Sequence, residues 1–336
     1  MKMPLRTMVA ATNRFLARRP HRSFRLTRRR DYSRSLKMPG YIAFTKFVNV
    51  TLWKYRKLFI LLAVVYAVLS AVLIGIGSQD TYSTLTSTLQ DTGSEVLEGN
   101  LAELKKAGLL FVSIAGSGLT TTPTEVQQVY TVILGLMIWL VTIWLLRNLL
   151  AGYKVRLRDG IYSAGAPIVA TFLVALVMVV QLIPLGIAVL GYSAATASGL
   201  LSGGVEAMLF WFAAALLAIL SLYWVTSTFF AMIIVTLPGM YPVKALKTAG
   251  DMVVGRRLRI LMRVIWMFGC IGVAWVLVLI PFILIDSGLK HLWMQIEWIP
   301  IIPTVLMVLG VASVVWSASY IYLLYRRVVD DDAKPA

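Results

Sequence analysis

The chain alternates long, uncharged apolar stretches with shorter polar connections. Six stretches contain 20 or more mostly apolar residues: 58–77, 129–150, 166–190, 207–237, 264–285 and 301–325. A helix needs about 20 such residues to cross the hydrocarbon core of a bilayer. The only charged residue inside these limits is Arg147, which stands near the end of its stretch and can reach the headgroups from there. The pattern predicts an all-α, polytopic membrane protein with six transmembrane helices.

Two apolar stretches contain a proline, Pro184 in the third and Pro281 in the fifth, and each follows a basic connection. Paired helices broken by proline in two halves of a chain can mark a transport site. Proline is also simply common in membrane helices, so both interpretations stay open. Gln181 is the one strongly polar side chain in the middle of a stretch, and we expect it to make an interhelical hydrogen bond.

The connections differ in charge, and this difference predicts the orientation. Of the 32 Lys and Arg residues, 29 lie in residues 1–57, 147–165, 237–263 and 326–336, whereas 9 of the 15 acidic residues lie in the other connections. Cytoplasmic connections carry the excess of Lys and Arg. We therefore expect both the N-terminus and the C-terminus to be cytoplasmic.

The same pattern divides the chain into parts. Residues 1–40 predict a basic, disordered cytoplasmic arm, and residues 41–57 an interfacial amphipathic helix, with Tyr41, Phe44, Val48, Leu52 and Tyr55 at helical spacing. The six-helix membrane domain covers 58–325 and includes an outer segment, 78–128. Outer loops are expected at 191–206, which should be mobile, and at 286–300. A cytoplasmic tail, 326–336, ends the chain.

The composition narrows the classes of function. Hydrophobic residues make up 59% of the chain and charged residues 14%, which is too apolar for a soluble domain. With one cysteine and two histidines, and without GxSxG, HExxH or Walker A motifs, we expect no cofactor, no metal site and no catalytic residue. His291 and Glu297 share an outer connection, so a lipid-handling enzyme remains an alternative, although a solvated histidine is the more common case.

The N-terminal arm is a candidate contact surface. It contains Arg25, Arg28, Arg29 and Arg30 close to the first membrane helix. Each such charge contributes on the order of 1 kcal/mol near an anionic leaflet. The arm could also neutralise nucleic-acid phosphates, but it offers few aromatic side chains for stacking on bases. We therefore favour anionic membrane lipid over nucleic acid.

The connection 237–263 is the second candidate contact surface. Pro242 suits the first turn of a helix, and Ala245, Leu246, Ala249, Met252 and Val253 follow helical spacing, which predicts a short amphipathic cytoplasmic helix. Gly255 joins this helix to a basic stretch. The expected contacts with anionic lipid or with a cytoplasmic protein partner are Lys244, Lys247, Arg256, Arg257 and Arg259.

Two family resemblances meet in this connection. Pro242-x-x-Ala245-Leu246-Lys247, followed by Gly255-Arg256-Arg257 and a long apolar stretch, resembles the YciC-like inner-membrane family and the membrane domain fused to some glycerophosphodiester phosphodiesterases. This resemblance implies a six-span membrane protein with cytoplasmic loops. It transfers no catalytic residue, because the soluble phosphodiesterase domain is absent from this chain.

A second resemblance concerns the segment Ala245 to Gly250, which is similar to the coupling loop of ABC permeases. In that family the loop docks on a separate ATPase, but Lys244 stands here where the family has glutamate. The sequence thus predicts a non-enzymatic, envelope-associated protein of a bacterial cytoplasmic membrane. A transporter subunit such as an ABC-type permease is the first alternative and the lipid-handling enzyme the second. The sequence does not indicate an oligomeric state.

Overall fold

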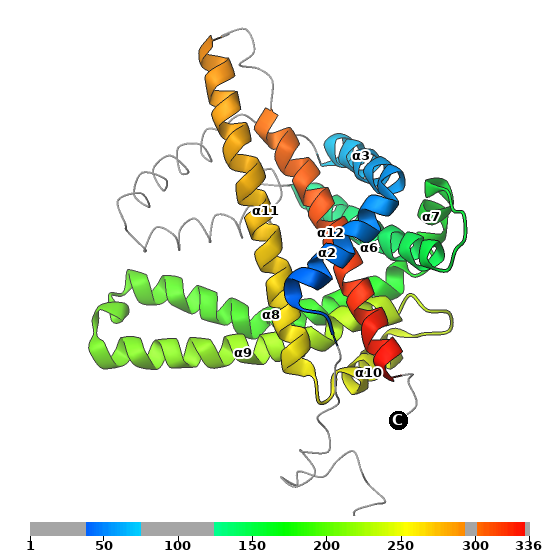
Figure 1. Cartoon of the computed structure of the whole chain (residues 1–336). Coiled ribbons are helices and arrows are strands. Elements are labelled where there is room, and N and C mark those ends of the chain that lie inside the picture. The colour runs from blue at the N-terminus through cyan, green and yellow to red at the C-terminus, as the bar shows by residue number, and fades with distance from the viewer. Residues whose placement is uncertain (1–37, 75–123, 293–300, 333–336) are drawn as a thin grey trace, which may run out of the picture.

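The computed structural model describes residues 38–74, 124–292 and 301–332, and every regular element in these ranges is helical (Figure 1). In chain order the elements are α2 (Tyr41–Lys54), α3 (Arg56–Leu73), α6 (Glu125–Leu150), α7 (Leu157–Ala164), α8 (Ile168–Ala197), η1 (Leu200–Ser202), α9 (Gly204–Ile234), α10 (Pro242–Val253), α11 (Arg257–Leu292) and α12 (Ile301–Asp332). Six of them, α3, α6, α8, α9, α11 and α12, are long and apolar enough to cross a membrane. The chain is therefore an all-α, polytopic membrane protein, as predicted.

The largest buried cluster of the described residues draws on most of the helices, with α3, α6 and α12 among them. Leu62 and Tyr66 of α3, Leu140 of α6 and Ile321 of α12 are all almost fully buried in it. The Tyr55 hydroxyl donates a hydrogen bond of 3.3 Å to the carbonyl of Leu149, at the end of α6. This bond fixes the point where the chain turns from α2 into α3.

The predicted helix at 41–57 is present, but it ends at Lys54 and packs on the protein. Phe44 is fully buried, and its ring meets the edge of the Tyr320 ring of α12 at 4.9 Å between centroids. Trp316, one turn before Tyr320 in α12, donates its indole N–H to Asn49 Oδ1 at 2.8 Å. The apolar stripe of α2 therefore serves protein packing as well as any contact with headgroups. The position of α2 at the membrane surface stays a prediction.

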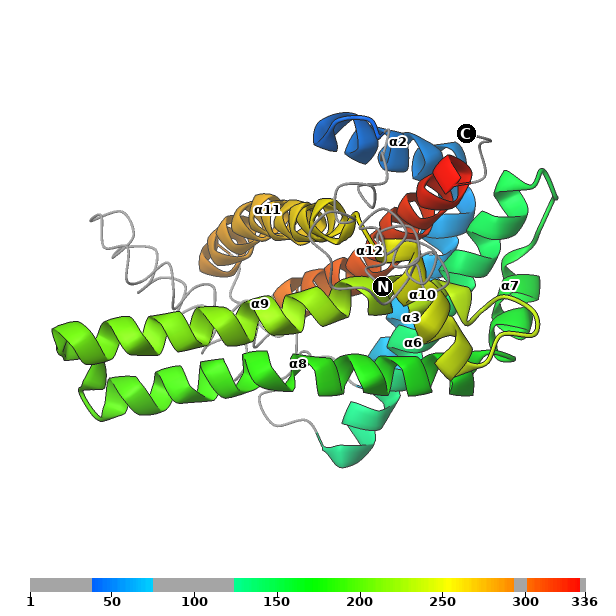
Figure 2. The ribbon, with the colours of Figure 1, turned by 90° about the horizontal axis from the view of Figure 1, so that it is seen from below.

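Helices α8 and α9 lie side by side as an antiparallel hairpin in both views (Figures 1 and 2), and Figure 1 shows the hairpin crosswise to α11. At the crossing, the rings of Phe229 and Phe268 are 6.2 Å apart. Within the most apolar window of each helix, only 6% of the residues of α8 and of α9 are buried, against 56% for α6. The described helices thus do not form one parallel bundle, and the surface of the hairpin is left for lipid or for another chain.

The two prolines do not break their helices. Helix α8 continues through Pro184 and α11 continues through Pro281. Next to Pro184, the backbone N–H of Leu185 donates to Ser221 Oγ of α9 at 3.0 Å. One turn away, Thr228 Oγ1 donates to Gln181 Oε1 at 2.6 Å, which confirms the predicted interhelical hydrogen bond of Gln181. Broken helices, the feature that would suggest a transport site, are not seen at these positions.

The predicted outer loops are shorter than expected. Of residues 191–206, most are helical, because α8 runs to Ala197 and α9 begins at Gly204; Gly199, at φ +71°, makes the turn between them. Backbone groups near lipid need internal hydrogen bonds, so small residues that permit a helix extend it. Likewise α11 continues to Leu292, which places Asp286 inside a helix, and α12 continues beyond residue 325.

Candidate functional site: a basic helix face

Helix α10 is the short amphipathic helix that the sequence predicts between the fourth and fifth apolar stretches. Pro242 occupies its first turn, where the missing N–H would have no intrahelical partner. Its apolar stripe is fully buried, mainly against α9, through Ala245, Ala249 and Val253. The packing of these three residues fixes which side of α10 faces outward.

The outward side of α10 combines cations with apolar side chains. Lys244 and Lys247 are both exposed. Beside them, Tyr241 and Val243 are 75% and 79% exposed. A surface with one aromatic ring, one aliphatic side chain and two ammonium groups suits the level of lipid headgroups, where rings are half wet and cations meet phosphates. Asp251, also exposed, is the acidic residue of this helix.

The beginning of α11 supplies further cations, which the structure separates by burial. Gly255, at φ +81°, turns the chain between α10 and α11. Arg259 is exposed, whereas Arg257 is half-buried with its guanidinium 4.2 Å above the Tyr223 ring of α9. Arg256 is only 2% exposed, so its guanidinium is not at the surface of the chain. Arg256 was predicted to contact anionic lipid or a protein partner, but its buried side chain is not placed to make that contact.

We call Tyr241, Val243, Lys244, Lys247 and Arg259 the α10 face. Helix α10, the beginning of α11 and the end of α12 lie at the same end of the molecule (Figure 1). Arg25, Arg28, Arg29 and Arg30, the other expected contacts, lie outside the described residues, so the structure does not bring them together with this face.

Sequence reasoning missed the structural role of Arg263. The cation count assigned it to a cytoplasmic connection, but it lies in α11 and is 7% exposed. Its Nη2 donates to the carbonyl of Pro39 at 2.7 Å, and its guanidinium lies 5.1 Å from the Tyr41 ring. Arg263 therefore holds the start of α2 against α11. No local pattern in the sequence signals this contact, because Pro39 is more than 200 residues away in the chain.

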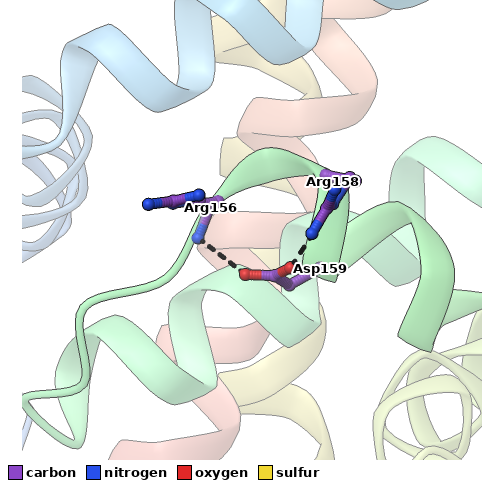
Figure 3. A network of polar contacts seen from close by, with 3 residues as sticks. All are labelled: Arg156, Arg158 and Asp159. Atoms are coloured by element: carbon purple, nitrogen blue, oxygen red, sulfur yellow. Dashed lines mark hydrogen bonds and ion pairs between the residues drawn. The ribbon is translucent and has the colours of Figure 1, made fainter.

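Helix α7 was also missed, and it carries a second group of cations. Asp159 accepts a hydrogen bond of 3.3 Å from the backbone N–H of Arg156, which satisfies a donor at the start of this helix (Figure 3). The Arg156 side chain points away from Asp159 in Figure 3, whereas Arg158 Nε lies 4.0 Å from its carboxylate. Both arginines are exposed, so this contact adds little stability.

The residues that the structure describes provide no arrangement that supports the enzyme alternative. Within the described ranges, no three His, Cys, Asp or Glu side chains come together in a way that could hold a metal ion. Glu297 lies outside those ranges, and His291 stands in the last turn of α11. Cys270 is half-buried in α11.

No protein-family model, curated protein or solved structure matches this chain. The fold and the α10 face therefore define the class, a polytopic membrane protein with a basic amphipathic helix between two of its long apolar helices. The finer assignment rests on the physical chemistry of that helix.

Proposed function

We propose that this chain is a non-enzymatic, envelope-associated protein of a bacterial cytoplasmic membrane, akin to the YciC-like family, whose α10 face binds anionic lipid headgroups. The observation that carries the proposal is the exposure of Tyr241 and Val243 beside Lys244 and Lys247. Exposure of these two apolar side chains to water brings no favourable free energy. At the headgroup level their burial adds to the attraction of the two ammonium groups for phosphate.

The direction of the face is set by the protein itself. Ala245, Ala249 and Val253 are fully buried, so α10 cannot rotate without exposing them. Each exposed lysine contributes on the order of 1 kcal/mol near an anionic leaflet. The pair would therefore favour anionic over neutral lipid by up to about 30-fold, since 1.4 kcal/mol is a factor of about ten.

A local reporter tests the proposal. A polarity-sensitive fluorophore is attached to Val243→Cys in a Cys270→Ala background, and the full chain is reconstituted in vesicles of phosphatidylcholine with increasing phosphatidylglycerol. We expect its emission to shift to the blue as the anionic fraction rises, and the shift to weaken at about 1 M salt, where the screening length is only about 3 Å. The same label at Val243→Cys in a Lys244→Gln/Lys247→Gln background is the matched control and should respond less.

Two results would contradict this function. The first is a Val243 signal that ignores phosphatidylglycerol or is unchanged in Lys244→Gln/Lys247→Gln. The second is a stoichiometric ATPase-sized partner, found by native mass spectrometry of protein extracted gently from its own membrane, that covers α10; this result would favour the permease alternative. Turnover of labelled lipid that is lost in His291→Ala would favour the enzyme alternative instead.

A further inference from the structure

An apolar groove of about 1090 Å³ lies between α2, α3, α11 and α12, away from the α10 face. We call it the α2–α12 groove; its lining includes Trp53, Arg56, Trp266, Gly269, Trp275 and Trp316. Small-molecule pockets in proteins span about 300–1,000 Å³, so the groove is as large as the largest of them. It is therefore roomy enough for a long aliphatic chain.

Three of the four tryptophans that line the groove donate their indole N–H groups to side chains of the protein. The Trp266 indole donates to Thr45 Oγ1 at 3.1 Å, and the Trp275 indole donates to Ser313 Oγ at 2.8 Å. The third indole, that of Trp316, donates to Asn49. With these donors engaged, the walls offer mainly rings and aliphatic groups, so the part of an occupant that lies inside must be apolar.

The rim of the groove has the opposite character. Arg56 is exposed at the junction of α2 and α3, and among the described lining residues it is the one that carries a charge. Its guanidinium stacks 5.0 Å from the Trp53 ring. A guanidinium in this position can donate two parallel hydrogen bonds to a phosphate. A cation at the rim of an apolar groove complements an amphiphile with an anionic head.

The surroundings of the groove supply such an amphiphile. Ile60 of α3 and Val273 and Leu277 of α11 line it and are 59%, 60% and 68% exposed, on the surface of two membrane-spanning helices. In a bilayer, these openings face the acyl chains of lipid rather than water. The charge of Arg56 then selects among the surrounding lipids by their headgroups.

We propose that the α2–α12 groove holds one acyl chain of an anionic phospholipid from the surrounding membrane, with the phosphate of its headgroup bound by Arg56. This site is separate from the α10 face, so it does not depend on the function proposed above. It gives the chain a defined lipid-binding site within its helices, in addition to the general attraction of its cytoplasmic cations for an anionic surface.

Photolabelling of the full chain in vesicles tests the site. The vesicles contain phosphatidylcholine and a trace of phospholipid with a diazirine in one acyl chain, carried either by phosphatidylglycerol or by phosphatidylcholine. We expect the label, mapped by proteolysis and mass spectrometry, in residues 266–277 and 309–316, with phosphatidylglycerol preferred. Arg56→Gln should lower this preference about fivefold, the effect of about 1 kcal/mol at one cation, while Lys57→Gln should leave it nearly unchanged.

Filling the groove provides the matched pair of variants. A side chain added at Gly269 or at Gly272 would meet no atom within 4 Å at its first carbon, so both positions accept substitution. Gly269 lines the groove and Gly272, one turn further along α11, does not. Gly269→Trp should abolish the labelling of the groove, whereas Gly272→Trp should retain it.

Three outcomes would overturn the proposal: equal labelling of the groove by both lipids, labelling that persists in Gly269→Trp, or no lipid label in residues 266–277 and 309–316, as expected where a second copy of the chain covers the groove. Because the reporter at Val243 reads a different surface, failure here is distinguishable from failure of the α10 face.

Discussion

Arg147 connects the ends of two long helices that are far apart in the sequence. Its Nη1 donates to the carbonyl of Thr236 at 3.1 Å, and its Nη2 donates to the hydroxyl of the same residue. Thr236 follows the end of α9, where backbone carbonyls lack intrahelical donors. We therefore expect Arg147→Met, which keeps an apolar stem and removes the guanidinium, to loosen α6 from α9.

The size of the effect follows from these contacts. Hydrogen bonds to a charged group contribute about 1.5–3 kcal/mol in soluble proteins. Interhelical hydrogen bonds in membrane proteins average about 0.6 kcal/mol and reach about 1.7. For the two bonds of Arg147 we expect a loss of about 1–3 kcal/mol in the free energy of unfolding. Thr236→Val removes one acceptor but keeps the carbonyl, so about 0.5–1 kcal/mol should be lost.

The assay is equilibrium unfolding in mixed micelles, with both single variants and the double variant measured in one cycle. The coupling energy should be about 0.5–1 kcal/mol, because each substitution removes the same hydroxyl–guanidinium bond. Arg158→Met is the control, since that side chain is 89% exposed, and it should change stability by less than about 0.5 kcal/mol. The reasoning would be refuted if the two single substitutions had additive effects on the free energy of unfolding. It would also be refuted if Arg147→Met lowered that free energy no more than Arg158→Met does.

Three further expectations can be measured directly. Phe44→Ala empties a fully buried site against Tyr320 and should cost about 3–5 kcal/mol in the same unfolding assay, unless the cavity collapses. Gly255→Ala places a side chain at φ +81°, so a loss of about 1 kcal/mol or more is expected, and an unchanged midpoint would contradict the strain. In a Cys270→Ala background, Ser198→Cys should react with an impermeant maleimide on intact cells and Lys247→Cys should not; the reverse pattern would invert the predicted orientation.

The number and class of the helices could be predicted because burial in lipid imposes a simple pattern. About 20 apolar residues in a row have few alternatives to a membrane helix, and all six predicted stretches coincide with long apolar helices. Helix α10 was also predictable, since Ala245, Ala249 and Val253 repeat at helical spacing among charged residues. There, one local pattern determines both the helix and the side that is buried.

The errors arise where tertiary contacts, rather than local patterns, decide the outcome. Arg263 is a cation at the end of a connection that was predicted to be cytoplasmic, and nothing local predicts its hydrogen bond to Pro39, more than 200 residues away in the sequence. The burial of Arg256 has the same origin, because the path of α11 past its neighbours cannot be deduced from spacing. The α2–α12 groove is assembled from four helices, so no segment of the sequence contains its signal.

The crosswise α8–α9 hairpin has a mechanical consequence. Its outer part contacts little besides its own two helices, while the inner part of α9 carries α10 through Ala245, Ala249 and Val253. Membrane helices tilt when the hydrocarbon thickness around them changes. With α10 at the headgroup level, as proposed above, a tilt of this hairpin would change the height of the α10 lysines relative to the phosphates when the bilayer thins or thickens.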